Sequence, residues 1–364
     1  MSGSASLFQR LLLPGLVFQS VIIGGGYATG RELVEFFVSR GPWGGLFGML
    51  LAMSIWSLVL AVSFEFSRLT RSYDYLTFFR NLLGRGWVLF EIPFCALIIV
   101  SLAVLGSATG AMLKNHFNVP DYTGTLLLAL LIGTLAFYGT ALIEKVFASW
   151  SLVLYSAYIA LFIWSWQSFG DAIATGFDTT MATADWYRGG LVYAGINIAA
   201  IPAILFSLRH LQTRQDAFYA GFLAGPIAMC PALLFYVLLI AHYPAIIDEE
   251  LPLAYILDQL NSRYFGYLFQ IIIVGTFIET GTALIHSLNE RIAVIFKPDE
   301  KPNWRGWWRP ATAVTALMLS VFLATKVGLV QLIAEGFGTL TYAFLLIFVI
   351  PVMTLGLWKI YRSN

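Results

Sequence analysis

The stretch Ser20-Val-Ile-Ile-Gly-Gly-Gly-Tyr-Ala-Thr-Gly-Arg31 interrupts an apolar run that otherwise suits a helix. Three consecutive glycines, Gly24 to Gly26, end the run, and Gly30 follows one turn later. Because each glycine costs about 1 kcal/mol relative to alanine inside a helix, the sequence predicts that the backbone unwinds here. In hydrocarbon, an unwound backbone is tolerated only where it faces protein or a watery cavity. We therefore expect two half-helices, whose bare carbonyls can bind a cation and whose bare N–H groups can bind an anion.

The same stretch also fits a packing motif. Gly26 and Gly30 form a G-x-x-x-G pattern, which lets a second helix approach closely. A dinucleotide-binding loop is excluded, because Thr29 occupies the place of the third glycine in G-x-G-x-x-G. The glycines therefore indicate either a broken helix or a close helix–helix contact.

The composition indicates a polytopic membrane protein. Of the 364 residues, 59% are hydrophobic and 11% are charged, whereas soluble domains carry about 25% charged residues. The net charge of +1 comes without a basic cluster, so we expect no nucleic-acid partner. Cys95 and Cys230 lie in apolar runs and predict no disulfide. The first apolar run continues past the glycines, so we interpret it as a span and not as a signal peptide.

Apolar runs of about 20 residues, the length that crosses a bilayer, predict ten spans. They cover residues 8–38 (broken at 24–26), 43–67, 87–113, 122–140, 143–168, 189–209, 216–243, 264–290, 308–328 and 334–360. Two short amphipathic helices are expected at the membrane surface, at Tyr73 to Leu83 and at Asp248 to Leu260. Residues 1–364 are thus expected to form one transmembrane domain.

The basic residues predict the orientation, since cytoplasmic loops are enriched in lysine and arginine. With both termini in the cytoplasm, most of the 21 lysines and arginines fall inside. The acids of the long loops, such as Asp171 and Asp248, fall outside. We expect a multi-pass protein of the plasma (cytoplasmic) membrane with both termini cytoplasmic.

The sixth span carries a second interruption, Gly195-Ile-Asn-Ile-Ala-Ala-Ile-Pro-Ala203. Asn197 is polar at mid-span, and Pro202 lacks a backbone donor and clashes with the preceding turn. Interrupted helices at corresponding positions in two halves point to a transporter binding site. An ordinary proline kink with a helix–helix hydrogen bond is the alternative.

The residues Ile23-Gly-Gly-Gly-Tyr-Ala-Thr-Gly-Arg-Glu32, followed by Phe-Phe and a Gly-Pro turn, resemble the opening of the YkvI-type bacterial membrane proteins. That family resembles a branch of the amino acid–polyamine–organocation transporters, which have the LeuT-type fold. The resemblance implies an all-α fold of ten spans with a five-plus-five inverted repeat, about 8–168 and 189–360, in which the first and sixth helices are broken. It also implies a substrate between the first, third, sixth, eighth and tenth spans, and a sodium ion between the first and eighth.

The two helix breaks supply the candidate substrate contacts. These are Gly24, Gly25, Gly26, Ala28 and Thr29 in the first span, and Asn197 and Ala199 in the sixth.

Glu279 is the deepest charged residue, and a charge at the bilayer centre costs roughly 2.5–3.5 kcal/mol on insertion scales. Its carboxylate, facing Ser20 and Ile23 with Thr276 and Thr280 beside it, is a candidate to bind sodium or carry a proton. A protonated glutamic acid that bridges helices is the alternative.

Arg31 lies five residues past Gly26, which places it just above the site on the outer side. We expect Arg31 and Glu335, near the outer start of the tenth span, to form a gate over bound substrate, since arginine suits a bidentate carboxylate pair. Pairing of Arg31 with Glu35 along its own helix is the alternative. Glu32 and Glu35 are expected in an outward vestibule or in helix packing.

These observations predict a secondary transporter that takes up a small amino acid or related amine-bearing solute by alternating access, with Na⁺ or H⁺. The substrate class is implied by the resemblance, and a polyamine is less favoured because only Glu279 lies deep. The alternative is an ion channel that uses the glycine break as its selectivity element. No H-E-x-x-H, G-x-S-x-G or cluster of His and Cys occurs, so we expect neither an enzyme nor a resident cofactor. The expected partners are the solute, the coupling ion and the lipid bilayer, and the sequence leaves the oligomeric state open.

Overall fold

The computed structural model describes residues 6–23, 25–138, 140–178, 182–296 and 307–362, and every regular element among them is a helix. The prediction of an all-α fold is confirmed. The α-helices are α1 (Leu13–Ile22), α2 (Gly25–Thr29), α3 (Arg31–Phe36), α4 (Pro42–Thr70), α5 (Tyr75–Leu83), α6 (Glu91–Phe117), α7 (Asp121–Tyr138), α8 (Thr140–Asp178), α9 (Trp186–Ile198), α10 (Ile201–Ile204), α11 (Arg214–Ile240), α12 (Pro252–Gln259), α13 (Arg263–Phe296), α14 (Trp308–Val327), α15 (Leu329–Gln331), α16 (Gly338–Phe344) and α17 (Leu357–Arg362). Turns of 3₁₀ helix occupy Val38–Arg40, Gly84–Phe90, Leu205–His210 and Ala245–Asp248, and turns of π-helix occupy Phe8–Leu12, Leu332–Phe337, Leu345–Val349 and Val352–Gly356.

Six helices among the described residues are long and apolar enough to cross a membrane. They are Pro42–Thr70, Tyr75–Phe117, Arg214–Ile240, Tyr264–Phe296, Trp308–Val327 and Leu329–Arg362. Trp186–Ile198 and Ile201–His210, bent by 45°, make a seventh if the pair is one span. Each of the ten predicted segments is mainly helical where it is described, but the count of ten spans and the inverted repeat stay predictions.

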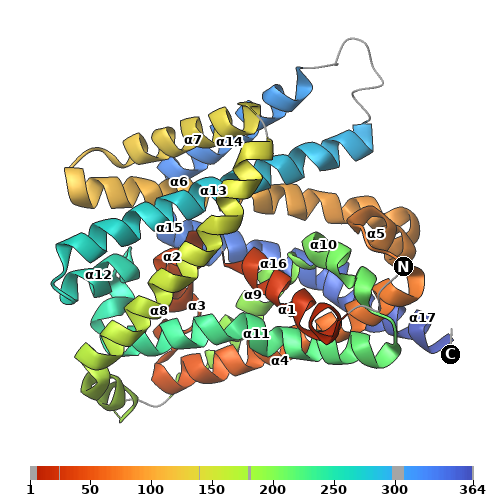
Figure 1. Cartoon of the computed structure of the whole chain (residues 1–364), viewed down its shortest axis with the longest axis horizontal. Helices are drawn as coiled ribbons and strands as arrows, with labels where there is room; N and C mark the ends of the chain where they lie inside the picture. The colour runs from red at the N-terminus through yellow and green to blue at the C-terminus, as the bar shows by residue number, and fades with distance from the viewer. Residues whose placement is uncertain (1–5, 24, 139, 179–181, 297–306, 363–364) are drawn as a thin grey trace.

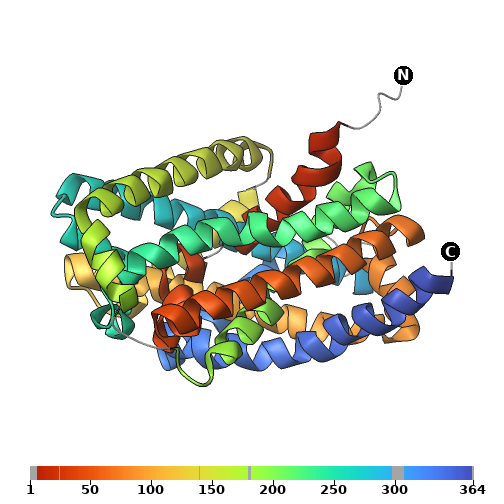
Figure 2. The same cartoon turned by 90° about the horizontal axis from the view of Figure 1, so that it is seen from below.

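The two ends of the chain lie at the same end of the helix bundle, together with α5 (Figures 1 and 2). α12 lies at the opposite end. Short helices occur where they were predicted, at 73–83 and 248–260, and their place at a membrane surface stays a prediction. α5 begins where the Asp74 carboxylate accepts a hydrogen bond from the Thr77 N–H at 2.8 Å, an N-cap that satisfies one bare donor.

α4 and α11 pack along each other, and α1 and α9 pack against this pair. A side chain at Gly221 of α11 would overlap the backbone of Ala61, and one at Gly225 would overlap Ser57. Small residues let helix backbones approach closely in lipid, where association depends on van der Waals packing. The α4–α11 pair therefore forms a firm wall behind the two broken helices.

The first span is broken twice. At Ile23 the backbone has φ −75° and ψ 79°, outside the helical region, and α1 ends there. Gly30 has a left-handed φ of 80°, and α3 begins directly after it. A left-handed φ carries little steric penalty for glycine, so Gly30 permits the second change of direction.

The prediction that the backbone unwinds across all three glycines is wrong for two of them. Gly25 and Gly26 belong to α2, and Gly24 lies outside the described residues. Tyr27, at 2% exposure, and Ala28, at 0%, are buried in this short helix. Helical hydrogen bonds satisfy the backbone groups where no water reaches them, and this gain exceeds the helix penalty of two glycines.

The predicted break in the sixth span is confirmed. α9 ends at Ile198 and α10 begins at Ile201, with Pro202 in the first turn of α10, where its missing N–H is not needed. The Asn197 side-chain N–H donates to the Tyr193 carbonyl of its own helix at 2.9 Å. This amide N–H therefore serves its own helix and not a bond to a second helix.

A buried ion pair joins α6 and α13 at the end of the bundle that holds both termini. Arg291 donates to both carboxylate oxygens of Glu91 at 2.9 Å, and the two side chains are 4% and 6% exposed. The guanidinium also lies 3.6 Å from the ring centre of Phe94 and 4.1 Å from that of Tyr75. The pair fixes the register of two long helices that line the cavity described next.

Candidate functional site

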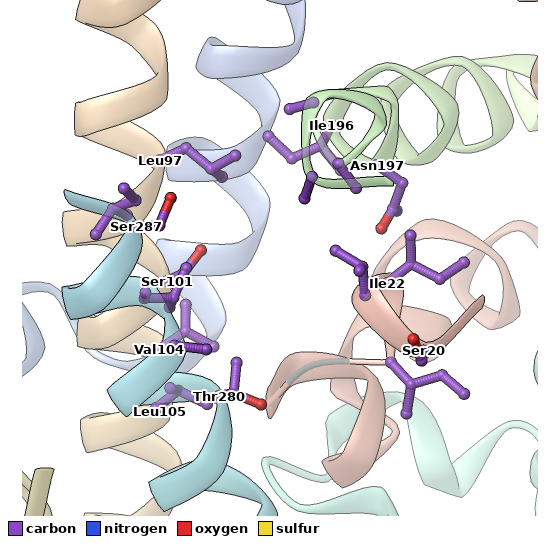
Figure 3. Close-up of a pocket in the computed structure, with 18 of the residues that line it drawn as sticks. Ser20, Ile22, Leu97, Ser101, Val104, Leu105, Ile196, Asn197, Thr280 and Ser287 are labelled. Atoms are coloured by element: carbon purple, nitrogen blue, oxygen red, sulfur yellow. The ribbon is translucent and has the colours of Figure 1, made fainter. Parts of the chain in front are cut away.

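A cavity of about 450 Å³ lies where the two broken helices meet α6 and α13. Ligand pockets in proteins commonly measure about 300–1,000 Å³. Figure 3 shows Ser101 and Ser287 on one wall, and Asn197 extending from α9 toward α1 on the other. The residues predicted from the sequence that line this cavity are Ser20, Ile23, Asn197, Ala199, Thr276, Glu279 and Thr280.

The oxygen-bearing side chains predicted to bind an ion come from α1 and α13. Ser20 donates its hydroxyl proton to the Val17 carbonyl at 2.8 Å, and Thr276 donates to the Ile272 carbonyl at 2.9 Å. Both hydroxyl oxygens keep lone pairs for a cation. Thr280 directs its hydroxyl toward the first span (Figure 3). Together with the Glu279 carboxylate, these groups offer the hard oxygen donors that a sodium ion or a proton requires.

Two of the substrate contacts predicted in α2, Ala28 and Thr29, are not among the described residues that line the cavity. Ala28 is fully buried, and its carbonyl accepts a hydrogen bond from the Tyr158 hydroxyl at 2.9 Å. Thr29 is 2% exposed, and its hydroxyl oxygen accepts from the Arg31 N–H at 3.3 Å. Among the described residues, the first span contributes residues 20–23 and Glu32 to the cavity wall.

Arg31, at the start of α3, connects this helix to the segment before α12. It is 5% exposed and donates to Glu35 at 2.8 Å and to the carbonyls of Ile247 and Glu249 at 2.9 Å each. Glu335 lies in a separate pocket near Arg188. In this conformation Arg31 forms the pair expected as the alternative, within its own helix, and not the gate pair with Glu335.

Exposure differs between the two sides of the cavity. Ser20 and Val21 of α1 are exposed, Val21 at 42%, although both line the cavity. On the other side, Glu32 is 8% exposed and Tyr27 is 2% exposed. The described cavity lining is therefore more exposed at α1 than at α3.

We compared the sequence and the fold of this chain with those of known proteins. No family model matches the chain. The chain is 22% identical over 337 residues to the uncharacterized membrane protein YkvI of Bacillus subtilis (strain 168). The match covers 90% of this chain and 92% of the relative. This similarity confirms the resemblance to the YkvI-type proteins.

Two solved structures share the fold. MhsT in complex with L-phenylalanine matches 96% of this chain and 88% of its own, with a TM-score of 0.61 and 14% identity. The manganese transporter of Eremococcus coleocola, in complex with an aromatic bis-isothiourea substituted compound, matches 95% and 78% with a TM-score of 0.55 and 14% identity. The chain has the LeuT-type fold. At this identity the similarity describes the architecture, and the site must be argued from the residues of this chain.

Within this LeuT-type fold, the cavity has polar residues that the sequence prediction missed. Ser287 follows Thr280 by seven residues, close to two helical turns, so the stripe of Thr276, Thr280 and Ser287 was a usable signal. Ser101 stood alone in an apolar run and gave no such signal. Glu32, expected in an outward vestibule or in helix packing, lines the central cavity. No periodicity predicted this position, because the break at Gly30 resets the direction of α3.

Proposed function

We propose that this protein is a secondary active transporter. It moves a small amino acid or related amine-bearing solute by alternating access, coupled to Na⁺ or H⁺. The observation that carries the proposal is the cavity at which both helix breaks meet, with the Glu279 carboxylate in its wall. The shared fold of MhsT, solved in complex with L-phenylalanine, supports the solute class.

The proposed cycle uses the two closures of the cavity in turn. In the conformation described, α3 is closed and α1 leaves a passage, so solute exchanges past Ser20 and Val21. The opposite state requires release of Arg31 from the segment before α12 and closure of α1 over Ser20. The breaks at Ile23 and Gly30 are the hinges that this movement needs, since few-residue hinges absorb such changes.

The coupling ion is proposed to bind between α1 and α13. Glu279 binds sodium together with Ser20, Ile23, Thr276 and Thr280, or carries a proton itself. Either cation lowers the cost of the carboxylate in the membrane. With the protein in the plasma membrane and both termini in the cytoplasm, the conformation described is the inward-facing one.

Counterflow in liposomes tests the proposal. The purified protein is reconstituted into liposomes loaded with one unlabelled solute, and uptake of the same labelled solute is followed for a set of amino acids and amines. A carrier gives transient accumulation of label above equilibrium, and a sodium or proton gradient drives net uptake. Flux without counterflow for every solute would contradict the carrier and favour the channel alternative, in which the glycine break is the selectivity element.

A further inference from the structure

Glu32 is a buried acid that faces the central cavity without a partner. It lies in the first turn of α3, is more than nine-tenths buried at 8% exposure, and lines the cavity. It makes no hydrogen bond or ion pair with any residue that the structure describes. The adjacent guanidinium of Arg31 is committed to Glu35 and to two loop carbonyls. A buried carboxylate stays charged only when it is paired, and otherwise it takes up a proton. Because no described residue pairs with Glu32, a partner for its charged form would have to come from the cavity.

The groups around Glu32 favour a hydrogen-bond donor with positive charge. The Tyr193 hydroxyl, within electrostatic reach of Glu32, is fully buried and has no partner among the described residues. Asn197 uses one of its two side-chain N–H donors on its own helix, and its side-chain oxygen is an acceptor on the cavity. A protonated amine, with up to three N–H donors, suits a carboxylate with such neighbours.

The charge of the described cavity lining is one-sided. Glu32 and Glu279 are acids, and none of the described lining residues is lysine, arginine or histidine. A zwitterionic amino acid would bring a carboxylate that meets no cationic side chain on this wall. α2 has only five residues, too few for a strong helix dipole to replace that side chain.

A hydrocarbon body fits this cavity better than a metal ion does. The described residues contain no group of three or more His, Cys, Asp or Glu that could hold a metal, whereas divalent ions take six or more oxygen ligands. Much of the wall is apolar, including Ile22, Leu97, Val104, Ile196 and Phe337. Such a surface suits the carbon chain or ring of an organic cation.

We propose that Glu32 binds the ammonium group of the solute, and that this solute is an organic amine that carries no carboxylate. This rests on the proposed function, because it takes the central cavity to be the transport site. Glu279 then remains for the coupling ion, so that each of the two acids receives its own cation.

Matched pairs of ligands test the charge preference in the wild-type protein. In detergent at fixed salt, the Kd of 2-phenylethylamine is compared with that of L-phenylalanine, and the Kd of 1,5-diaminopentane with that of L-lysine. Each pair differs only by the carboxylate. We expect the amine of each pair to bind about tenfold tighter or more, because the additional carboxylate of the amino acid would lose its hydration next to two acids and find no cationic side chain. Tighter binding of either amino acid, or no binding of either amine, would overturn the proposal.

Substitutions then test the role of Glu32. Glu32→Gln keeps the shape and removes the charge, and it should weaken amine binding by roughly ten- to a hundredfold, as for other hydrogen bonds to charged groups. Glu290→Gln is the matched control, because Glu290 lies outside the cavity and pairs with Arg309. It should leave the Kd within about twofold, well below one factor of ten in affinity. An unchanged Kd in Glu32→Gln would overturn the assignment, and if that variant does not fold, the matched ligand pairs decide alone.

Failure of this inference is distinguishable from failure of the proposed function. Counterflow of an amino acid, with no preference for its amine, would leave a transporter whose solute is not selected by Glu32. Absence of counterflow for every solute, amines included, would contradict both.

Discussion

Arg31 binds Glu35 at 2.8 Å, one turn further along α3, and its other terminal nitrogen donates to the carbonyls of Ile247 and Glu249 at 2.9 Å each. The two carbonyls belong to the segment just before α12, at the end of the bundle remote from both termini (Figure 1). A single guanidinium thus joins the second half of a broken helix to the segment before α12. This contact holds α3, which carries the cavity-lining Glu32, against that segment.

A double-mutant cycle tests this contact. In the solute-free protein, Arg31→Ala and Glu35→Ala should be non-additive in unfolding free energy by about 0.5 kcal/mol or more, as for contacting residues. Arg31→Ala and Glu335→Ala should add within about 0.3–0.5 kcal/mol, as for separate residues. Larger coupling to Glu335 than to Glu35 would contradict the contact described.

The same variants test the gate predicted over bound solute. If Arg31 turns to Glu335 when solute binds, their losses of counterflow should be non-additive even though their losses of stability add. If the loss of counterflow in Arg31→Ala is additive with that in Glu335→Ala and non-additive only with that in Glu35→Ala, Arg31 acts through α3 and does not form a gate with Glu335.

Glu279→Gln should separate coupling from exchange. The variant cannot bind the coupling cation through a carboxylate, so uptake driven by a sodium or proton gradient should be lost. Exchange need not return an empty carrier, so counterflow should persist. Both are measured in the same liposomes, with Glu290→Gln as the control. Undiminished uphill accumulation would make Glu279 a structural residue that bridges helices.

The buried pair of Glu91 and Arg291 should dominate the stability of the end that holds the termini. Arg291→Met leaves an unpaired buried carboxylate and should lower the free energy of unfolding by about 3–5 kcal/mol. Lys114→Met removes a pair in which both side chains are about 60% exposed, and such surface pairs contribute about 0–1 kcal/mol. Denaturation of both variants in detergent gives the comparison. If both variants lose the same free energy of unfolding, the buried pair of Glu91 and Arg291 stabilises the protein no more than an exposed pair does.

The contact between Arg40 and Asp185, at 2.6 Å, should resist acid until low pH. The hydrogen bond from the Thr183 hydroxyl, assisted by Arg40, lowers the pKa of Asp185 below its usual 3.8. A carboxyl with a lowered folded pKa stabilises the protein above the unfolded pKa, and the effect is lost as the pH falls through the folded value. The difference in melting temperature between wild type and Asp185→Asn should therefore be constant from pH 8 to 5 and shrink only below 3.8. A difference that already fades near neutral pH would contradict this.

The helix breaks were predictable because glycine and proline act through local backbone chemistry. Pro202 lacks a donor wherever it lies, and the break around it appears as expected. The extent of unwinding was not predictable, because burial of Tyr27 and Ala28 keeps Gly25 and Gly26 helical. Propensity competes there with the cost of bare backbone groups in a dry environment, and tertiary contacts decide the outcome.

The direction of side chains beyond a break was also outside the reach of sequence periodicity. Helical spacing relates Thr276, Thr280 and Ser287 along one continuous helix, so their common face follows from the sequence. It does not relate Glu32 to Ser20, because the breaks at Ile23 and Gly30 lie between them. The partner of Arg31 depends in turn on which conformation is occupied, since Glu35 lies on its own helix and Glu335 does not.

Modification of a single cysteine tests most directly that the central cavity carries the solute. Ser101→Cys, in a background without Cys95 and Cys230, places a thiol on the cavity wall. Arg85→Cys, in the same background, is the control, because Arg85 is exposed in the 3₁₀ turn Gly84–Phe90. A bulky thiol reagent applied to the purified protein should abolish counterflow in Ser101→Cys and leave Arg85→Cys active. Bound solute should slow the reaction at Ser101→Cys alone. Full modification of Ser101→Cys with unchanged counterflow would contradict the account, because the solute would then pass elsewhere.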